Sequence, residues 1–246
     1  MRILVVNPNT SAAMTEKIGA AARAVAAAGT EIIAANPADG PVSIEGYYDE
    51  VFSVPGLLAE IAKAEALGVS AHVIACFDDT GLEAARSLAS APVIGIGEAA
   101  FHLASLLAHR FAVVTTLSRA IPAIETNLTK YGLATRCARV RACEVPVLAL
   151  DDPASNASAL IGAEIERAKR DDRAEAIVLG CAGMAELAAR LTEQHGLPVI
   201  DGVAGAVKLA EACSELNLKT SKIGAYAAPQ PKPYLGNLAA FAPRPR

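Results

Sequence analysis

The chain consists of two similar halves, and each half carries a cysteine directly after a short apolar segment. The cysteines are Cys76, in VIACFDDT, and Cys181, in IVLGCAGM, 105 residues apart. RILVVNPNTS from Arg2 resembles RFAVVTTLSR from Arg110, and PVIGIGEAAFHLA aligns with PVIDGVAGAVKLA at an offset of 106 residues. We interpret this as duplication of a whole domain. Two copies related by an approximate two-fold axis would place the two thiols across one cleft.

Strand-like and helix-like patterns alternate along both halves. Strands are expected at residues 3–6, 30–34, 71–75, 92–96, 111–115, 140–146, 176–179, 198–200 and 223–227. Helices are expected at residues 11–28, 54–67, 81–89, 98–107, 120–131, 156–171, 184–195 and 202–216, and a loop at 36–50. Repeated strand–helix units predict an α/β fold of parallel sheets with right-handed crossovers.

Composition narrows the classes further. The chain is 53% hydrophobic but has no Trp, so its core must be built from Val, Ile, Leu and Ala, as in sheets buried on both faces. A net charge of −4 offers no basic face, and we expect no nucleic-acid partner. No apolar run approaches the roughly 18 residues of a membrane span, and the start does not look like a signal peptide. With five cysteines and no export signal, we expect reduced thiols and a cytoplasmic location.

The ends of the expected strands are the positions to inspect, because α/β sheets bind ligands beyond the carboxyl ends of their strands. Cys76 and Cys181 both lie where a strand gives way to a helix, and backbone N–H groups there stabilise a thiolate. We therefore expect both to be catalytic. Cys137, Cys143 and Cys213 lie within or beside regular elements, and we interpret them as structural.

The sequence fits metal-binding, disulfide oxidoreductase and dinucleotide-binding patterns less well. The chain has no CxxC or HExxH spacing, so we expect no metal site. The two cysteines are too far apart in sequence for a typical disulfide oxidoreductase. GIGEAA, residues 95–100, matches a loose dinucleotide fingerprint but lacks the N-terminal strand–helix–strand context. We expect these glycines, Gly95 among them, to let the backbone approach a small ligand.

Polar groups follow the first strand of each half. The segment NPNTS, residues 7–11, forms a turn and a helix N-cap in the simplest interpretation. The same amides and hydroxyls could also bind carbonyl oxygens of a ligand. Thr115 and Thr116 occupy the equivalent place in the second half.

Several of these motifs together resemble the aspartate/glutamate racemase superfamily, in particular its hydantoin racemase branch. They span nearly the whole chain: NPNTS at 7–11, GPVSIEGYYDE at 40–50, ACFDDTGLEAAR at 75–86, GIGEA at 95–99, LGCAGM at 179–184 and PVIDGV at 198–203. The resemblance implies two Rossmann-like lobes related by a pseudo-two-fold axis, each a parallel sheet flanked by helices. Lobe 1 would comprise residues 1–100 with a returning C-terminal segment, 217–246, and lobe 2 would comprise residues 101–216.

The resemblance also implies a cofactor-independent racemase whose active site lies between the lobes. Cys76 and Cys181 would be its two acid/base residues. Position and resemblance together give the expected substrate-binding residues: Asn9, Pro41, Ser43, Ile44, Phe77, Asp78, Asp79, Gly95, Thr115, Thr116, Gly183 and Met184.

One departure from the superfamily bears on the substrate. Amino-acid racemases usually carry Asn-Thr after the first cysteine and Thr-Glu after the second, whereas here Phe77-Asp78-Asp79 and Ala182-Gly183 follow. This favours an uncharged cyclic ureide, such as a 5-monosubstituted hydantoin, in a pocket closed by Phe77, Ile44 and Met184. Allantoin racemase, aspartate or glutamate racemase, maleate isomerase and a non-catalytic ligand-binding protein remain alternatives. We expect a homo-oligomer, as for most soluble enzymes.

Overall fold

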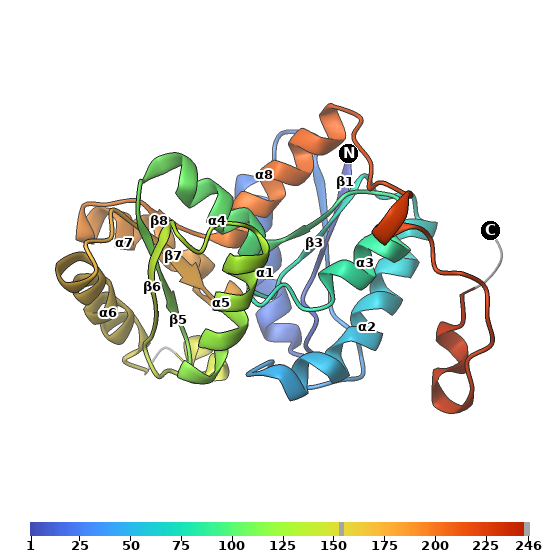
Figure 1. The fold of residues 1–246 in the computed structure, drawn as a ribbon, viewed down its shortest axis with the longest axis horizontal. Coiled ribbons are helices and arrows are strands. Elements are labelled where there is room, and N and C mark those ends of the chain that lie inside the picture. Colours follow the sequence, from blue (N-terminus) through green and yellow to red (C-terminus); the bar gives the residue numbers. More distant parts are fainter. Residues whose placement is uncertain (153–154, 244–246) are drawn as a thin grey trace.

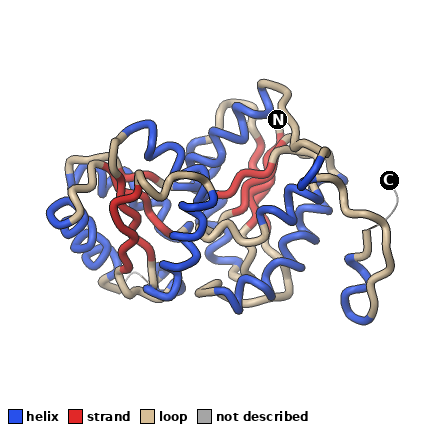
Figure 2. Tube along the Cα trace, viewed as in Figure 1, coloured by secondary structure: helices blue, strands red, loops and turns tan. Residues whose placement is uncertain are grey.

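Two four-stranded parallel sheets lie side by side in the computed structural model, which describes residues 1–152 and 155–243 (Figures 1 and 2). The first sheet contains β1 (Arg2–Val6), β2 (Glu31–Ala35), β3 (Ala71–Ile74) and β4 (Val93–Gly95), in the order β2-β1-β3-β4. The second contains β5 (Phe111–Thr115), β6 (Cys137–Ala142), β7 (Ala176–Gly180) and β8 (Val199–Ile200), in the order β6-β5-β7-β8. The orders are identical once four is added to each number, which is the topology that a duplicated domain requires.

Helices cover the faces of both sheets. In the first half they are α1 (Ala12–Val25), α2 (Tyr47–Ala66), α3 (Leu82–Leu88) and α4 (Ile96–Leu107). In the second half they are α5 (Ile121–Lys130), α6 (Ala157–Asp171), α7 (Ala188–His195) and α8 (Gly202–Glu215). Short 3₁₀ helices are η1 (Ser118–Ala120), η2 (Val147–Asp151), η3 (Ala182–Leu187), η4 (Gly224–Tyr226) and η5 (Gly236–Phe241).

The central strands explain the aliphatic composition. Val5 of β1 lies opposite Ala34 of β2 and Val73 of β3, and β5 occupies the same central place in the second sheet. The β1 residues from Ile3 to Val6 and all of β3, β5 and β7 are buried. Such strands need small or branched apolar side chains on both faces.

The two halves exchange their fourth helices. The helix α4 packs against β7 of the second sheet, and α8 packs against β3 of the first sheet. Phe101 of α4 stacks on Phe111 of β5, with ring centroids 6.1 Å apart. One buried apolar cluster therefore contains Val73 of the first half and Val178 of the second. The division at residue 216 follows chain order, but the packing of α8 joins it to the first sheet.

The C-terminal segment returns to the first half but does not form the expected strand at 223–227. Residues 224–226 form η4 instead, Ile223 is 87% exposed, and neither sheet of the described residues includes this segment. Hydrogen bonds anchor the segment beside α3. The Nζ of Lys222 donates to the carbonyl oxygens of Arg86 (2.6 Å) and Ser87 (3.1 Å), and the backbone N–H of Thr220 donates to Ser90 (3.2 Å).

Two negative findings apply to residues 1–152 and 155–243. None of their helices is both long enough and apolar enough to cross a membrane. No three His, Cys, Asp or Glu side chains in these ranges are grouped to hold a metal ion.

Candidate active site

A cavity lies between the two halves at the carboxyl ends of β1, β3, β5 and β7, and both candidate cysteines line it. The empty space there, counted together with the adjoining solvent, is about 450 Å³. Its lining comes from both halves: Asn7, Asn9, Met14, Ile44, Ala75, Cys76, Phe77 and Asp78 from the first, and Thr115, Thr116, Ala120, Val147, Gly180, Cys181 and Ala182 from the second. The parallel sheets thus bring together residues that are 172 or more positions apart, such as Asn9 and Cys181.

Cys76 lies in an environment that favours the neutral thiol. It follows the end of β3, and the hydroxyl of Thr80 donates to its Sγ at 3.4 Å. Burial raises the pKa of Cys76 well above its usual range, and the negative charge of Asp78 raises it further. The expected help from a helix N-terminus is small here, because α3 begins only at Leu82. The backbone N–H of Asp78 does lower the pKa of Cys76, as expected for a strand end, but burial outweighs it.

Cys181 stands in a different local setting. It directly precedes Ala182, the first residue of η3, and η3 leads into α7. The partial positive charge of a helix N-terminus favours an anion at such a position. Gly180, one residue earlier, lets β7 approach β5. A Cβ at Gly180 would lie 2.8 Å from the Cβ of Thr115, whose hydroxyl donates to the Gly180 carbonyl at 3.0 Å.

Asn9 is held with its amide nitrogen available to a ligand. Its Oδ1 accepts from the Nδ2 of Asn7 at 2.7 Å and from the backbone N–H of Ser11 at 2.9 Å. Its Nδ2 meets only the sulfur of Met14, at 3.5 Å, which is a weak acceptor. The network thus orients the amide and leaves its donor for the cavity.

Asp78 brings a carboxyl group to the cavity beside Cys76. Its backbone carbonyl accepts from the Nδ2 of Asn127 in α5 at 2.7 Å, a bond that joins the two halves. Burial and the nearby charge of Glu50 raise the pKa of Asp78 to about 7.

Glu50 is a residue that sequence reasoning missed. It lies in the first turn of α2, and the structure starts this helix at Tyr47, although residues up to 50 were expected to form a loop. Its Oε1 is buried, and no described residue donates a hydrogen bond to it. Burial raises the pKa of Glu50. No local sequence pattern indicates that Glu50 influences the pKa of Asp78, because tertiary packing brings the two side chains close together.

Asp79 and Gly95 are placed at the start of α4, away from the cavity. The carboxylate of Asp79 accepts from the backbone N–H groups of Gly97 (2.9 Å) and Glu98 (2.8 Å) and from the hydroxyl of Tyr131 (2.7 Å). A Cβ at Gly95 would lie 2.1 Å from Oδ1 of Asp79. Gly95 therefore makes room for a protein carboxylate, and its backbone does not approach the cavity.

The other expected binding residues lie around the cavity without lining it. The carbonyl of Pro41 accepts from the N–H of Thr10 at 2.9 Å, and Ser43 lies in the same loop, just before Ile44. Gly183 lies beside Cys181, because a Cβ there would be 3.7 Å from the sulfur. Met184 is fully buried in the core of the second half. Its place at the cavity is taken by Met14 and Val147, neither of which the sequence analysis selected.

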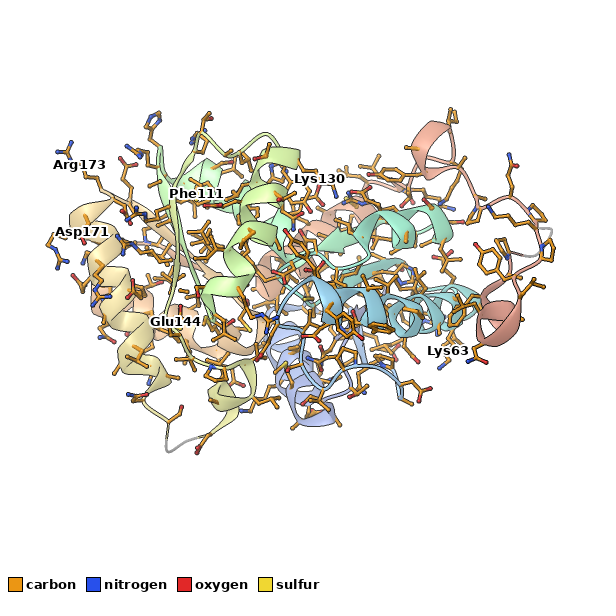
Figure 3. The ribbon with its side chains drawn as sticks, turned by 60° about the horizontal axis from the view of Figure 1, so that its bottom comes forward. Lys63, Phe111, Lys130, Glu144, Asp171 and Arg173 are labelled. Carbon is orange, nitrogen blue, oxygen red and sulfur yellow. The ribbon has the colours of Figure 1, made fainter. Side chains whose placement is uncertain are left out.

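Contacts near the cavity and at the helices join the two halves. The Oε1 of Glu45 accepts from the backbone N–H of Val147 at 3.0 Å. On another side, Lys130 of α5 forms an ion pair with Glu83 of α3, and Figure 3 shows Lys130 where α5 meets the first half.

A model of the Asp/Glu/hydantoin racemase family matches residues 3–210 of the chain. A protein of Rhizobium meliloti named hydantoin racemase is 51% identical over 237 residues, which cover 96% of this chain and 98% of that protein.

Solved structures agree with this assignment. The structure of an allantoin racemase from Klebsiella pneumoniae has a TM-score of 0.96 and 49% identity, covering 99% of this chain and 100% of the other. A glutamate racemase from Francisella tularensis shares only 16% identity at a TM-score of 0.66, over 89% of this chain and 84% of the other, which shows likeness of fold alone. The chain belongs to the Asp/Glu/hydantoin racemase family and is an isomerase of the racemase type.

Proposed function

We propose that this racemase inverts C5 of 5-monosubstituted hydantoins without a cofactor, using Cys76 and Cys181 as its two acid/base groups. The observation that carries the proposal is that both cysteines, at equivalent strand ends of the two halves, line a single cavity.

The chemistry follows from the position of C5 next to a carbonyl group. The thiolate of one cysteine removes the C5 proton, and the electron pair passes to the carbonyl oxygen to give an enolate. The thiol of the other cysteine then donates its proton to the opposite face, and the carbonyl re-forms. The substrate is inverted, and the two cysteines have exchanged protonation states. The raised pKa of Cys76 favours its neutral thiol as a proton donor in the resting enzyme.

Two donors are available to the developing enolate oxygen. One is the Nδ2 of Asn9, whose orientation the Asn7 network fixes. The other is the hydroxyl of Thr116, which makes no hydrogen bond to any of the described residues. Thr115 cannot serve, because its hydroxyl donates to Gly180. Removal of one such donor costs on the order of 3 kcal/mol of transition-state stabilisation.

The charges of the lining favour an uncharged substrate. No Lys, Arg or His is among the described residues that line the cavity, whereas Asp78 is. A free α-carboxylate would meet no cation and would face a carboxyl group. The N–H groups of a ureide ring can donate hydrogen bonds to the carboxyl group of Asp78. This disfavours aspartate, glutamate and maleate as substrates.

The test is the optical rotation of two substrates, L-5-benzylhydantoin and (S)-allantoin, incubated with the protein with and without iodoacetamide. We expect loss of rotation of the benzyl compound and its suppression by alkylation. Loss of rotation of allantoin alone would favour a second candidate function, that of an allantoin racemase. The similarity to the Klebsiella structure is the observation that favours this candidate. Stable rotation of both compounds would contradict the proposal.

A further inference from the structure

The last part of the chain leaves the body of the molecule. The chain is anchored as far as residue 226, where the ring of Tyr226 lies 5.9 Å from the guanidinium carbon of Arg86. Residues 228–243, which we call the arm, then run away from the first half (Figures 1 and 2). Within the arm, η5 contains no buried residue.

In the single chain, the arm exposes several apolar side chains to water. Leu235 is 86% exposed, and Leu238, Tyr234 and Phe241 are also exposed. An isolated exposed leucine is ordinary, but several on one short segment indicate a surface that is covered in use.

The arm is too stiff to fold back easily on its own chain. Pro229, Pro231 and Pro233 alternate along its first part. Such sequences favour the extended polyproline conformation, in which each residue advances the chain by about 3.1 Å. The prolines therefore act as a spacer that carries η5 outward.

A second exposed apolar surface lies at the start of α2. We call it the α2 patch, and it consists of Val42, Tyr47, Tyr48, Val51 and Phe52. Tyr48 is 73% exposed, and its ring lies 4.9 Å from that of Phe52, centroid to centroid. Two neighbouring aromatic rings in water are typical of interface anchors.

The charges around the two surfaces are complementary. From residue 228 to the last residue, 246, the sequence contains one Lys and two Arg and no Asp or Glu, although the whole chain has a net charge of −4. The segment 39–52, which contains the α2 patch, has four Asp or Glu and no Lys or Arg. Opposite potentials of this kind fix the partner and orientation of an interface.

We infer that the arm of one chain docks on the α2 patch of a second copy of the same chain. Apolar residues of the arm would cover Tyr48 and Phe52, and the contact would be reciprocal in a two-fold dimer. The contact is independent of the proposed substrate.

The test is the molar mass in solution, measured by size-exclusion chromatography with light scattering. We expect the wild-type protein to exceed the 25.2 kDa of one chain. Deletion of residues 228–246 should reduce the mass, and so should Tyr48→Asp with Phe52→Asp in the full chain. Leu106→Asp changes an equally exposed leucine at the end of α4 and should leave the mass unchanged.

A mixing experiment identifies the contact itself. A chain without the arm still has the α2 patch, and the doubly substituted chain still has the arm. Together they can form one arm–patch contact, so we expect a mixed species heavier than either alone. A monomeric wild-type protein, a patch variant of wild-type mass, or no mixed species would each overturn the inference.

Discussion

Cys76 and Cys181 occupy equivalent positions, but their neighbours differ. Cys76 is followed by Phe77 and Asp78, and Cys181 by Ala182 and Gly183. Only the first thiol therefore has a carboxyl group two residues away, and that group raises its pKa. The duplication places one cysteine from each half at the cavity, and the residues that follow the two cysteines differ between the halves.

Serine at either cysteine should abolish racemisation in both directions. General acid–base groups contribute about 10²–10⁴-fold to a rate, and a serine hydroxyl is too weak an acid to replace a thiol. Each variant keeps one thiol, so it should still exchange the C5 hydrogen with D₂O for one enantiomer, as followed by NMR.

Cys213→Ser is the matched control, because Cys213 lies on α8 outside the cavity lining. It should keep wild-type activity. Full activity in Cys76→Ser or Cys181→Ser would eliminate the two-base scheme.

Asp78→Asn should make Cys76 easier to ionise. The pKa of Asp78 is about 7, so its carboxyl group becomes charged across neutral pH and then opposes a thiolate at Cys76. Without that charge, the rising limb of kcat/KM against pH should move to lower pH for the enantiomer that uses Cys76 as base. The measurement is a pH profile for each enantiomer.

The exposed Asp171 at the end of α6 supplies the control (Figure 3). Asp171→Asn removes the same charge far from the cavity and should leave both profiles in place. A rising limb that stays fixed, or moves to higher pH, in Asp78→Asn would contradict the electrostatic role.

At the scale of elements, the two halves cap their fourth helices differently. In the first half Asp79, from the loop after β3, binds the first N–H groups of α4. In the second half Asp201 itself precedes α8 and accepts from Val203 and Ala204, both at 2.9 Å. By the sequence alignment Gly95 corresponds to Asp201, and Asp79 to the buried Met184. The capping carboxylate has moved from one loop to the other.

Substitutions that give α4 the capping arrangement of α8 should show that positions 79 and 95 are energetically coupled. Asp79→Met leaves the buried N–H of Gly97 and the part-buried N–H of Glu98 without their acceptor, at up to about 1–3 kcal/mol each. Gly95→Asp places a side chain where Asp79 lies. The double variant recreates the second-half pattern. We expect it to lose less free energy of unfolding than the sum of the single variants, by more than about 1 kcal/mol. Urea unfolding measures all three, and strict additivity would contradict the account.

The strands and most helices could be predicted from the sequence, because apolar runs alternate with amphipathic segments. The glycines of GIGEA could also be recognised in the sequence, but the structural reason for Gly95 could not be predicted. The approach of Asp79 to Gly95 joins two loops, and no local pattern reports it. The strand expected at 223–227 failed for a similar reason: an apolar run forms a strand only where a sheet edge can pair with it.

For the molecule as a whole, duplication predicted two matching sheets and a shared cavity, and both cysteines line that cavity. The exchange of α4 and α8 between the sheets was not predictable. Chain order assigns each helix to its own half, and the apolar face of a helix does not specify which sheet it will cover.

The exchange predicts that neither half folds alone. Residues 1–109 would lack α8, whose Val203, Ala206 and Val207 are buried in the shared cluster. We expect this fragment to show little secondary structure by circular dichroism. The full chain should unfold in one transition, seen alike by circular dichroism and by tyrosine fluorescence. Cooperative unfolding of the fragment would contradict a shared core.

The crossed packing of α4 and α8 also determines how a substrate reaches the cysteines. A bilobed enzyme often admits its ligand by swinging its lobes apart, but here such a movement would pull each exchanged helix off the sheet that it covers. The passage has to open locally instead. Ile44 and Val147 both line the cavity, and the N–H of Val147 donates a hydrogen bond to Glu45, so we expect these two segments to part when a substrate enters.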